Sequence, residues 1–357
     1  MTVRIVVLGG GIVGTVVASR LLAEDGTRRI TLVDAGLVGS GASQYSAGVH
    51  FPVGRSARVK ALAATSADYY ERLRASAPAV PIHPFEPWVA ADSAQAAEVE
   101  ARCDGLRVPN AADGRVPAGL APGLALWRLP GCHVADVQQV AQWHARQLRG
   151  RAELLEGLRV VAIDESTAGV HVRLSNGRTL AADALMLAPG PWANTRAFKP
   201  FTEALGIRIK KVVALHVDPA PARAAALFFP LEDAFLAPLP HRGHGLFSYT
   251  CTQWDVTPEA MRYESLERRE LDEAQAVLAR VAPGLLARPP TGGRVFCDAY
   301  GPEREPIVRG VGTHGRIVFV GAANGSGYRL APGMADEAAG LLRHFDPQQG
   351  FLPHANF

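Results

Sequence analysis

Residues 3–14 read VRIVVLGGGIVG, and this stretch decides the fold of the chain. Val3 to Leu8 is almost entirely aliphatic and lacks the polar alternation of a half-exposed strand, which indicates a strand buried on both faces of a parallel sheet. Thr15 to Leu22 continues as an apolar helix. Between strand and helix stand three glycines with the spacing G-x-G-x-x-G: Gly9, Gly11 and Gly14. In such a turn the first glycine permits the bend, the second lets backbone approach a pyrophosphate, and the third lets helix and strand pack closely.

The residues after this turn favour a dinucleotide site. Arg28 to Val33 reads as a second strand, and Asp34 ends it, twenty residues after Gly14. An acidic residue at this distance accepts hydrogen bonds from the adenosine ribose, and the helix N-terminus presents N–H groups and positive charge to the phosphates. The alternative is an ordinary βαβ unit with an accidental cluster of glycines, which the combined strand, turn, helix and acid disfavour.

Length and composition limit the class of protein. The chain has 357 residues, enough for two domains or for one large domain with a second embedded in it. Its apolar share of 48% and charged share of 20% are those of a globular protein with a sizeable core. The formal net charge of +3 is too balanced to indicate a nucleic-acid partner.

Two further classes are disfavoured by the residues. The apolar stretch Ile5–Ala23 carries adjacent glycines and Arg20, which favour a buried βα unit over a signal peptide or membrane helix, so we expect a cytoplasmic protein without a transmembrane segment. The cysteines form no C-x-x-C pair, so neither structural zinc nor a disulfide framework is expected and no metal site is predicted. They are Cys103, Cys132, Cys251 and Cys297.

Along the rest of the chain, Gly36–Gly48 and Gly321–Gly333 read as glycine-rich loops, and residues 104–131 as irregular structure. Helices are expected at 60–77, 93–102, 134–148, 263–282 and 334–344. Strands are expected at 84–91, 159–163, 169–174, 178–181, 184–188, 208–218, 294–297 and 316–320. The segment from 219 to about 256 has the short apolar runs of a twisted antiparallel sheet.

Four motifs occur in the order of a known family: GGGIVG, the strand ended by Asp34, LMLAPGPWA at 185–193, and GAANGSGYRLAPG at 321–333. The chain thereby resembles the flavin-dependent superfamily of D-amino-acid oxidase, glycine oxidase and sarcosine oxidase. The resemblance implies an α/β fold with a Rossmann-type FAD-binding domain and an inserted substrate domain built on a mixed or antiparallel sheet. The FAD-binding domain would comprise residues 1–50, 132–200 and 294–357, and the substrate domain residues 51–131 and 201–293. It also implies FAD as the bound dinucleotide in place of NAD.

The resemblance further implies which residues contact FAD. Those of the pyrophosphate turn and ribose contact are Gly9, Gly11, Ile12, Val13, Gly14, Asp34 and Ala35. Those beside the flavin ring are Ala42, Ser43, Ser46, Ala47 and Gly48, with Val161 as backbone contact to adenine and Gly190 and Trp192 as a second dinucleotide contact. Those of the loop over the pyrimidine end of the flavin are Gly325, Ser326, Gly327, Tyr328, Arg329 and Leu330.

Substrate contacts are implied less directly. Arg329 matches the basic position that binds the substrate carboxylate in sarcosine oxidases, and the alternative is contact with flavin phosphate or solvent. His50, His244 and Tyr249 are the other candidates for catalytic residues near the flavin. The chain departs from the family twice. His50 and Phe51 stand where sarcosine oxidases carry an arginine. Residues 298–308 read DAYGPEREPIV where glycine oxidases carry an arginine ahead of a proline; Arg304 is a possible substitute, and the alternative is that it pairs with Glu303 and Glu305 in solvent. A simple glycine, sarcosine or D-amino-acid substrate is therefore not expected.

Cys297 lies near the position that bonds covalently to flavin in monomeric sarcosine oxidases, and the alternative is a buried, unreactive thiol. The oxygen-activating lysine of those enzymes aligns with Phe247, so dehydrogenase or slow oxidase behaviour is open.

The sequence thus predicts an FAD-dependent oxidoreductase that oxidises a C–N bond of an amino acid or of a secondary or cyclic amine. The reaction would transfer a hydride to flavin N5, with O2 or another electron acceptor as the second partner. One alternative is an FAD-dependent 2-hydroxy-acid dehydrogenase, with His50, His241 or His244 as the base. Others are a non-catalytic dinucleotide-binding subunit and an NAD-binding protein.

Overall fold

The computed structural model describes residues 2–218, 226–286, 289–343, 345–346 and 350–351, and the chain divides into two compact units. The first unit comprises Met1–Ser46, Val137–Ile209 and Cys297–Phe357. The second comprises Ala47–Asp136 and Lys210–Phe296. The sequence placed the domain boundaries after residues 50, 131, 200 and 293, whereas the chain passes between the units after residues 46, 136, 209 and 296.

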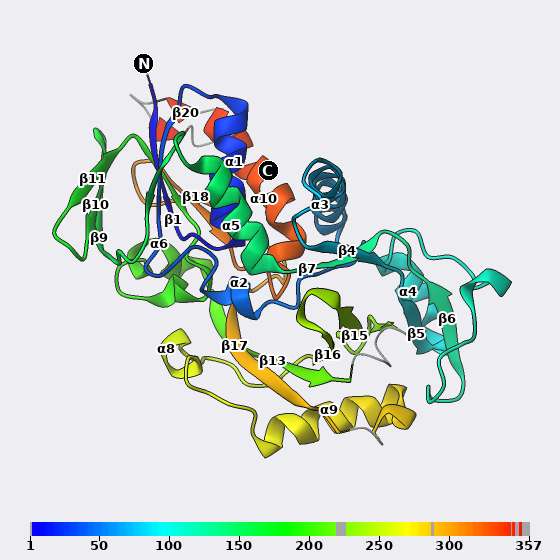
Figure 1. Ribbon diagram of the computed structural model, residues 1–357. Helices are drawn as coiled ribbons and strands as arrows, with labels where there is room; N and C mark the ends of the chain where they lie inside the picture. The colour runs from blue at the N-terminus through cyan, green and yellow to red at the C-terminus, as the bar shows by residue number, and fades with distance from the viewer. Residues whose placement is uncertain (1, 219–225, 287–288, 344, 347–349, 352–357) are drawn as a thin grey trace. The chain divides into compact units, whose positions relative to one another are not determined.

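The first unit is built on a six-stranded sheet with the order β18-β19-β12-β1-β2-β8 (Figure 1). Its strands are β1 (Arg4–Leu8), β2 (Arg29–Val33), β8 (Glu153–Leu155), β12 (Ala184–Leu187), β18 (Ile307–Val311) and β19 (Ile317–Gly321). All neighbours pair in parallel except β18, which runs antiparallel to β19. Ile5 to Leu8 of the central strand β1 are at most 3% exposed, which accounts for the unbroken aliphatic run in the sequence.

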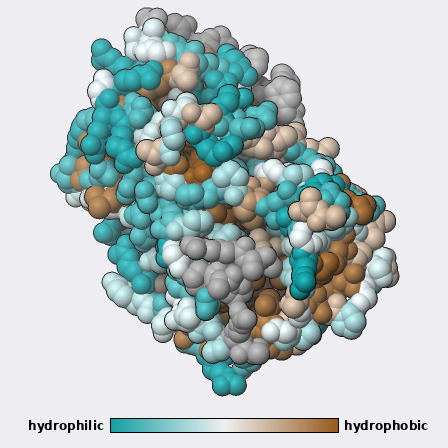
Figure 2. Space-filling model, turned by 45° about the vertical axis from the view of Figure 1, so that its right-hand side comes forward, coloured by the Kyte–Doolittle hydropathy of each residue, from teal (hydrophilic) through white to brown (hydrophobic). Residues whose placement is uncertain are grey.

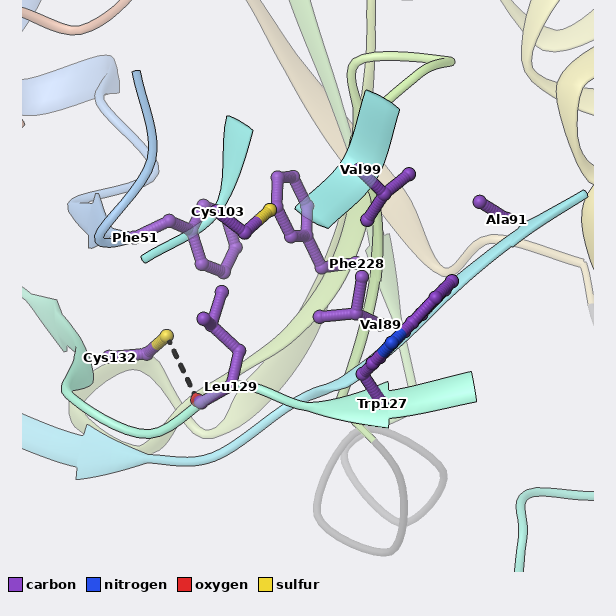
Figure 3. Close-up of a cluster of buried hydrophobic side chains, with 9 residues drawn as sticks. All are labelled: Phe51, Val89, Ala91, Val99, Cys103, Trp127, Leu129, Cys132 and Phe228. Carbon is purple, nitrogen blue, oxygen red and sulfur yellow. Dashed lines mark hydrogen bonds between the residues drawn. The ribbon is translucent and has the colours of Figure 1, made fainter. Parts of the chain in front are cut away.

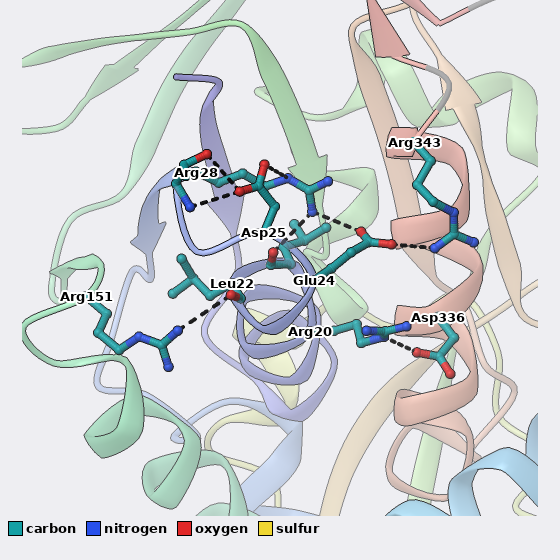
Figure 4. A network of polar contacts seen from close by, with 10 residues as sticks. Arg20, Leu22, Glu24, Asp25, Arg28, Arg151, Asp336 and Arg343 are labelled. Atoms are coloured by element: carbon teal, nitrogen blue, oxygen red, sulfur yellow. Dashed lines mark hydrogen bonds and ion pairs between the residues drawn. The ribbon is translucent and has the colours of Figure 1, made fainter. Parts of the chain in front are cut away.

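Three longer helices accompany this sheet: α1 (Ile12–Glu24), α5 (Val137–Leu148) and α10 (Gly327–Arg343). Helix α1 packs against both α5 and α10, so most of its surface is buried and its sequence is apolar nearly all round. Its polar side chains lie at the edges of the packing, where Arg20 pairs with Asp336 and Glu24 with Arg343 (Figure 4). The short helices are α2 (Ala42–Tyr45), α6 (Lys199–Thr202) and two 3₁₀ turns (Gly190–Asn194 and Glu203–Leu205).

A three-stranded antiparallel sheet in the same unit joins β9 (Val160–Ser166), β10 (Gly169–Leu174) and β11 (Thr179–Ala182). Its anchor to the larger sheet is Glu165, whose carboxylate accepts backbone N–H bonds from Thr313, His314 and Arg316 before β19. At the end of the described chain, β20 (Phe345–Asp346) pairs with β21 (Gly350–Phe351).

The second unit is built on a seven-stranded sheet with the order β17-β13-β16-β15-β14-β5-β6. Its strands are β5 (Trp88–Asp92), β6 (Leu124–Arg128), β13 (Arg208–Val217), β14 (Leu227–Phe229), β15 (Ala234–Leu239), β16 (His244–Tyr249) and β17 (Gly292–Tyr300). A small sheet joins β3 (Val49–His50), β7 (Cys132–Ala135) and β4 (Ile82–Phe85). The helices are α3 (Ala57–Ser76), α4 (Ala96–Arg102), α8 (Pro258–Met261), α9 (Arg268–Val281) and 3₁₀ turns at Ser93–Gln95, Ala111–Asp113, Pro240–Arg242 and Pro283–Leu285.

One hydrophobic cluster of the second unit joins strands of its large sheet to neighbouring segments (Figure 3). Phe51 stacks on Phe228 with ring centroids 4.1 Å apart, and Trp127 and Val89 pack into the same cluster. Cys132 lies at the edge of this cluster, where its Sγ donates to the carbonyl of Leu129 at 3.3 Å. Phe51 therefore has a packing role that its place after the glycine-rich loop did not indicate.

Several sequence expectations were wrong in their element bounds. The expected helix at 134–148 begins only at Val137, because Cys132–Ala135 forms the strand β7 between β3 and β4. The expected irregular stretch 104–131 contains β6, which pairs with β5. The expected strand at 84–91 is two strands belonging to different sheets, with Glu86-Pro87 between them. The expected helix at 263–282 begins at Arg268, with a capping box between Glu267 and Glu270.

No helix among the described residues is long and apolar enough to cross a membrane. On the face drawn in Figure 2, hydrophilic residues cover much of the surface and hydrophobic ones are gathered in smaller patches.

Candidate functional site

The turn after β1 needs glycine at its first and third positions for reasons internal to the protein. Gly9 has φ +109°, and a Cβ there would lie 2.1 Å from the carbonyl oxygen of Ala188. A Cβ at Gly14 would lie 1.8 Å from the carbonyl oxygen of Gly9. Both contacts are with backbone, which has little freedom to move away. The sharp turn and the close approach of helix α1 to the strand therefore exclude side chains at both positions.

Gly11 differs from these two glycines. Its φ is −71°, which any residue adopts, and the nearest atom to an added Cβ is Ser43 Oγ at 3.3 Å. An added Cβ would meet no backbone here, and the Ser43 side chain would have to shift by a few tenths of an ångström to admit it. Because Gly11 is the N-cap of α1, an added Cβ would instead occupy space in front of the helix N-terminus. This is the kind of cradle that a pyrophosphate requires.

The N-terminus of α1 supplies the donors of this cradle. The N–H of Ile12 donates to Ser43 Oγ at 2.9 Å, and Ser43 is buried. Helix geometry leaves the N–H groups of Val13 and Gly14 without intrahelical acceptors. These N–H groups and the partial positive charge of the helix end are suited to a phosphate oxygen.

Asp34 stands at the end of β2, as the ribose-binding acid should. Its carboxylate accepts N–H bonds from Gly10 at 2.6 Å and Gly36 at 2.7 Å. Burial raises the pKa of this carboxyl, the charge of Glu156 raises it further, and the two N–H bonds oppose the rise. Each carboxylate oxygen has two acceptor positions, so each can still accept a hydroxyl. Ala35, the next residue, is exposed.

The segment after β8 lies beside Asp34. Leu158 donates its N–H to the carbonyl of Asp34 at 3.0 Å, and Gly157 donates to that of Gly36 at 3.0 Å. Val161 follows on β9 and is 51% exposed, and Leu37 is 65% exposed. Two exposed apolar side chains near the acid suit an aromatic base, because a base buries its faces against apolar groups. The strand β8 that positions this segment has only three residues, too few for a periodic signal.

Two other expected cofactor segments lie together in the first unit. Residues 42–45 form one helical turn, α2, within the glycine-rich stretch. A Cβ at Gly41 would lie 3.1 Å from the ring of Trp192, so the tryptophan lies against the backbone that leads into α2. Gly190 has φ +55° and begins the 3₁₀ turn that carries Trp192. Ser46 ends this segment of the first unit, and Ala47 and Gly48 belong to the second.

The loop between β19 and α10 has a strained backbone. Ala322 and Asn324 have φ of +50° and +55°, values that residues with a side chain rarely adopt, and Gly325 has +78°. Such residues cost about 1–3 kcal/mol each and cluster at ligand sites. Asn324 stabilises the conformation, since its Oδ1 accepts from Gly301 N at 3.1 Å and its Nδ2 donates to Ala322 O at 3.0 Å.

Asp298 supports the same loop and was missed by the sequence analysis as a site residue. Its carboxylate accepts N–H bonds from Ala299, at 2.8 Å, and from Gly325. Burial raises the pKa of Asp298 to about 6, although both N–H bonds oppose the rise. Asp298 is therefore a positioning residue for the loop. The one cue in the sequence was its place directly after the apolar strand residues 295–297.

Helix α10 begins within the expected loop. The sequence placed the helix start at Met334, but the structure has it at Gly327, so Tyr328, Arg329 and Leu330 are helical. Tyr328 and Leu330 are at most 3% exposed, and burial raises the pKa of the Tyr328 hydroxyl. Arg329 is half-buried, and its Nη2 donates to Ser326 Oγ at 3.1 Å. The exposed part of the segment is thus Gly325.

In the second unit, His50 is fully buried. Its ring stacks on His133 with centroids 4.8 Å apart, and Tyr70 packs edge-on against both. Burial lowers the pKa of His133 to about 3.

His244 and Tyr249 lie on opposite faces of β16, because strand side chains alternate and the two are five positions apart. The Tyr249 hydroxyl donates to the carbonyl of Glu270 on α9 at 2.9 Å. On the same face, buried Lys211 pairs with buried Glu270 at 2.6 Å. These contacts fasten α9 to the sheet, so the two residues do not line one common cavity.

Two further questions concern the cysteine named for flavin attachment and the presence of a metal site. Cys297 is 1% exposed on β17. No group of three or more histidine, cysteine or acidic residues within the described part of the chain has a geometry that could hold a metal ion.

A parallel sheet whose first strand ends in this glycine turn, with an acid at the end of the next strand, defines a dinucleotide-binding protein. The donors of α1, the space at Gly11 and the acceptors of Asp34 fit the pyrophosphate and ribose of FAD. A family model described as "FAD dependent oxidoreductase" (DAO) matches residues 4–341. The chain belongs to this family and is an FAD-dependent oxidoreductase.

Solved structures of the same fold cover nearly the whole chain. L-proline dehydrogenase from P. horikoshii is 17% identical with a TM-score of 0.79, and the match covers 97% of each chain. Glycine oxidase from Geobacillus kaustophilus is 17% identical with a TM-score of 0.76, covering 99% of this chain and 100% of that one. Iminodiacetate oxidase from Chelativorans sp. BNC1 is 20% identical with a TM-score of 0.71, covering 95% of each. A search of curated proteins found no match.

Proposed function

We propose that this enzyme oxidises the C–N bond of an amino acid or of a secondary or cyclic amine. The observation that carries the proposal is the dinucleotide site of the first unit, where the N-terminus of α1 and the Asp34 carboxylate suit a pyrophosphate and a ribose. The family assignment supports FAD as its occupant. The printed names of three proteins with this fold, glycine oxidase, L-proline dehydrogenase and iminodiacetate oxidase, all denote oxidation of amino or imino acids.

The residues that would hold FAD come from three segments of the first unit. Val13 and Gly14 would donate to the pyrophosphate, and Asp34 would accept from the ribose. Leu37 and Val161 would flank the adenine, and Trp192 and the loop at Gly325 would bound the remainder. When bound, FAD supplies a hydride acceptor.

The two candidate substrate residues that keep some exposure are Arg329 and His244. Arg329 suits a carboxylate because its planar guanidinium pairs with both oxygens. We assign His50 and Tyr249 to structural support, since His50 is buried among rings and Tyr249 is bonded to α9. The main task of the protein is then to orient the amine and exclude water.

The experiment is anaerobic reduction of the purified flavoprotein by a panel of amino acids, secondary amines, cyclic amines and 2-hydroxy acids. Bleaching of the flavin absorbance with release of ammonia or a free amine supports the proposal. Bleaching by 2-hydroxy acids alone would show that the enzyme is an alcohol dehydrogenase instead. Hydrogen peroxide formation in air identifies O2 as the acceptor, and its absence, with turnover on an artificial dye, identifies a dehydrogenase.

Covalent attachment of FAD at Cys297 is a separate proposal. Acid denaturation of the holoenzyme leaves a yellow pellet if the flavin is attached, and C297S releases it to the supernatant. A colourless wild-type pellet contradicts attachment.

A further inference from the structure

One carboxylate of the first unit has no cation paired with it. Asp298, near the end of β17, accepts N–H bonds from Ala299 at 2.8 Å and from Gly325. Within the described part of the chain, no lysine, arginine or histidine forms an ion pair with this carboxylate. Its negative charge is therefore stabilised by two backbone N–H groups alone, and the protonation of such a group responds to any further charge placed nearby.

The titratable side chains around Asp298 do not compensate its charge. They lie on β13, on β17, in the turn after β17 and on α10: Arg208, Cys297, Tyr300, the charged residues 303–305, Tyr328 and Arg329. None of them contributes to the pKa of Asp298, which burial raises to about 6 against the two N–H bonds. At pH 7 this carboxyl is mostly ionised, and a modest further rise in its pKa would leave it neutral.

The backbone that Asp298 holds belongs to the loop between β19 and α10. Gly325 has positive φ, as do Ala322 and Asn324 before it. A Cβ at Gly325 would lie 3.1 Å from the Tyr300 hydroxyl, so the loop packs directly against the end of β17. The proposed function assigns this loop to FAD. The Asp298 carboxylate is then one hydrogen bond away from backbone that would contact the cofactor.

Flavin reduction would change the charge next to this loop. Hydride transfer from the amine carbon brings two electrons and one proton to the flavin, which thereby gains one negative charge. A like charge nearby raises the pKa of a carboxyl. The Asp298 carboxylate would then take a proton from solvent and become a neutral carboxylic acid. The one bond formed in this step is the O–H bond of Asp298, and the net charge of the site stays as it was before reduction.

We infer that Asp298 takes up a solvent proton when the bound flavin is reduced, so that this side chain controls how strongly the reduction potential depends on pH. Asp298 acts through its charge and through the Gly325 backbone, and it does not react with the substrate. The inference rests on the proposed binding of FAD at this loop. It adds a coupling between flavin reduction and proton uptake to the proposed amine oxidation.

The test measures the reduction potential of the FAD-loaded protein from pH 5 to pH 8, by reduction with dithionite in the presence of reference dyes. For a two-electron couple, each additional proton taken up changes the potential by about 30 mV per pH unit. Between pH 6 and pH 8 the potential of the wild type should therefore fall more steeply than that of D298N, by up to about 30 mV per pH unit. At pH 5, where both side chains are mostly neutral, the two potentials should nearly coincide.

Two control variants separate charge from structure. D336N removes an acid of α10 that pairs with Arg20 and has a side chain 45% exposed, so it should leave the dependence on pH unchanged. N324G suits the positive φ of this position and removes the two side-chain bonds that support the loop, without a change of charge. It should also keep the wild-type dependence on pH.

Where D298N fails to bind FAD, D298S carries the test, since serine is a short acceptor without charge. Equal slopes of potential against pH in the wild type and the folded variants would overturn the inference. So would a steep wild-type slope that N324G abolishes, because the effect would then come from the loop conformation. A wild-type slope of about 30 mV per pH unit, the value for the single proton of the hydride, overturns the inference without any variant.

The outcome is separable from that of the proposed function, because dithionite reduces the flavin without substrate. A flavin that no amine bleaches, with the expected difference between wild type and D298N, refutes amine oxidation and supports the proton uptake. Amine oxidation together with equal slopes in wild type and D298N supports the proposed function and refutes the role of Asp298.

Discussion

The glycine turn of the first unit and a basic cluster of the second unit are built on opposite principles. The turn is a backbone structure, and Gly9 and Gly14 are there because side chains do not fit. The basic cluster is made of side chains from β4, β13, β16, β17 and the turn before β16, namely His83, His216, His241, His244 and Arg294. The residues of the glycine turn are contiguous in the chain, so the turn can be recognised in the sequence. A side-chain site depends on sheet order and register, which spacing along the chain does not reveal.

The largest effect is expected from G14A. The added methyl meets the Gly9 carbonyl at 1.8 Å, so strand and helix must separate. We expect a loss of more than about 4 kcal/mol in unfolding free energy, in the range of severe core defects. Circular dichroism and thermal unfolding of the flavin-free protein measure it. A G14A protein with wild-type Tm would show that the packing of α1 on β1 is not tight.

K211A tests how much a buried contact between side chains of distant segments stabilises the second unit. It leaves Glu270 as a buried carboxylate without its 2.6 Å partner, and breaking such a pair costs about 3–5 kcal/mol. Urea unfolding measures the loss. K60A is the control, since it breaks a more exposed pair with Asp104 and should cost at most about 1 kcal/mol. Similar losses of unfolding free energy in K211A and K60A would show that burial does not make the Lys211–Glu270 pair more important for stability than the exposed pair.

G11A separates folding from ligand binding. The added methyl meets only the Ser43 hydroxyl, at 3.3 Å, and a small shift of that side chain relieves the contact. The Tm of flavin-free G11A should therefore stay within about 2 °C of wild type, corresponding to at most about 1 kcal/mol. Its FAD affinity should fall at least tenfold, because the methyl enters the pyrophosphate cradle. Fluorescence titration with FAD measures this. Wild-type affinity in G11A would place the pyrophosphate elsewhere.

D298N has the smallest expected effect, and it depends on pH. The folded pKa of about 6 lies above the ordinary 3.8, so the folded state binds this proton more tightly and the resulting stabilisation is lost as pH rises from about 4 to 6. Asparagine keeps an acceptor for Ala299 and Gly325 but does not ionise. The Tm of D298N relative to wild type should therefore be higher at pH 7 than at pH 4.5. A difference independent of pH would contradict the raised pKa.

The parallel sheet and the glycine turn were predictable because each rests on local patterns: Ile5–Leu8 of β1 and the whole of β12 are continuous apolar runs, and Asp34 directly follows β2. The match of residues 4–341 to the family model confirms the predicted FAD-dependent oxidoreductase. The start of α10 was mispredicted because Gly325, Gly327 and Pro332 read as loop, whereas tertiary packing of α1 on α10 outweighs their low helix propensity.

The substrate side was less predictable for a physical reason. His241 and His244 were noted from the sequence, but their neighbours His83, His216 and Arg294 lie up to about 200 residues apart and meet only through strand pairing. Tyr249 and His244 lie five residues apart on one strand and therefore point to opposite faces of the sheet. This could be predicted only if the bounds of the strand were known.

The division of the chain into five alternating segments has a consequence for synthesis. The first strand, β1, bonds to β12 at residues 184–187, and β12 bonds to β19 at residues 317–319. The glycine turn is therefore synthesised long before the strands that complete its sheet. A fragment that stops before β19 carries the whole turn sequence but lacks the strand that pairs with β12, so it should not form the sheet that holds the turn in place.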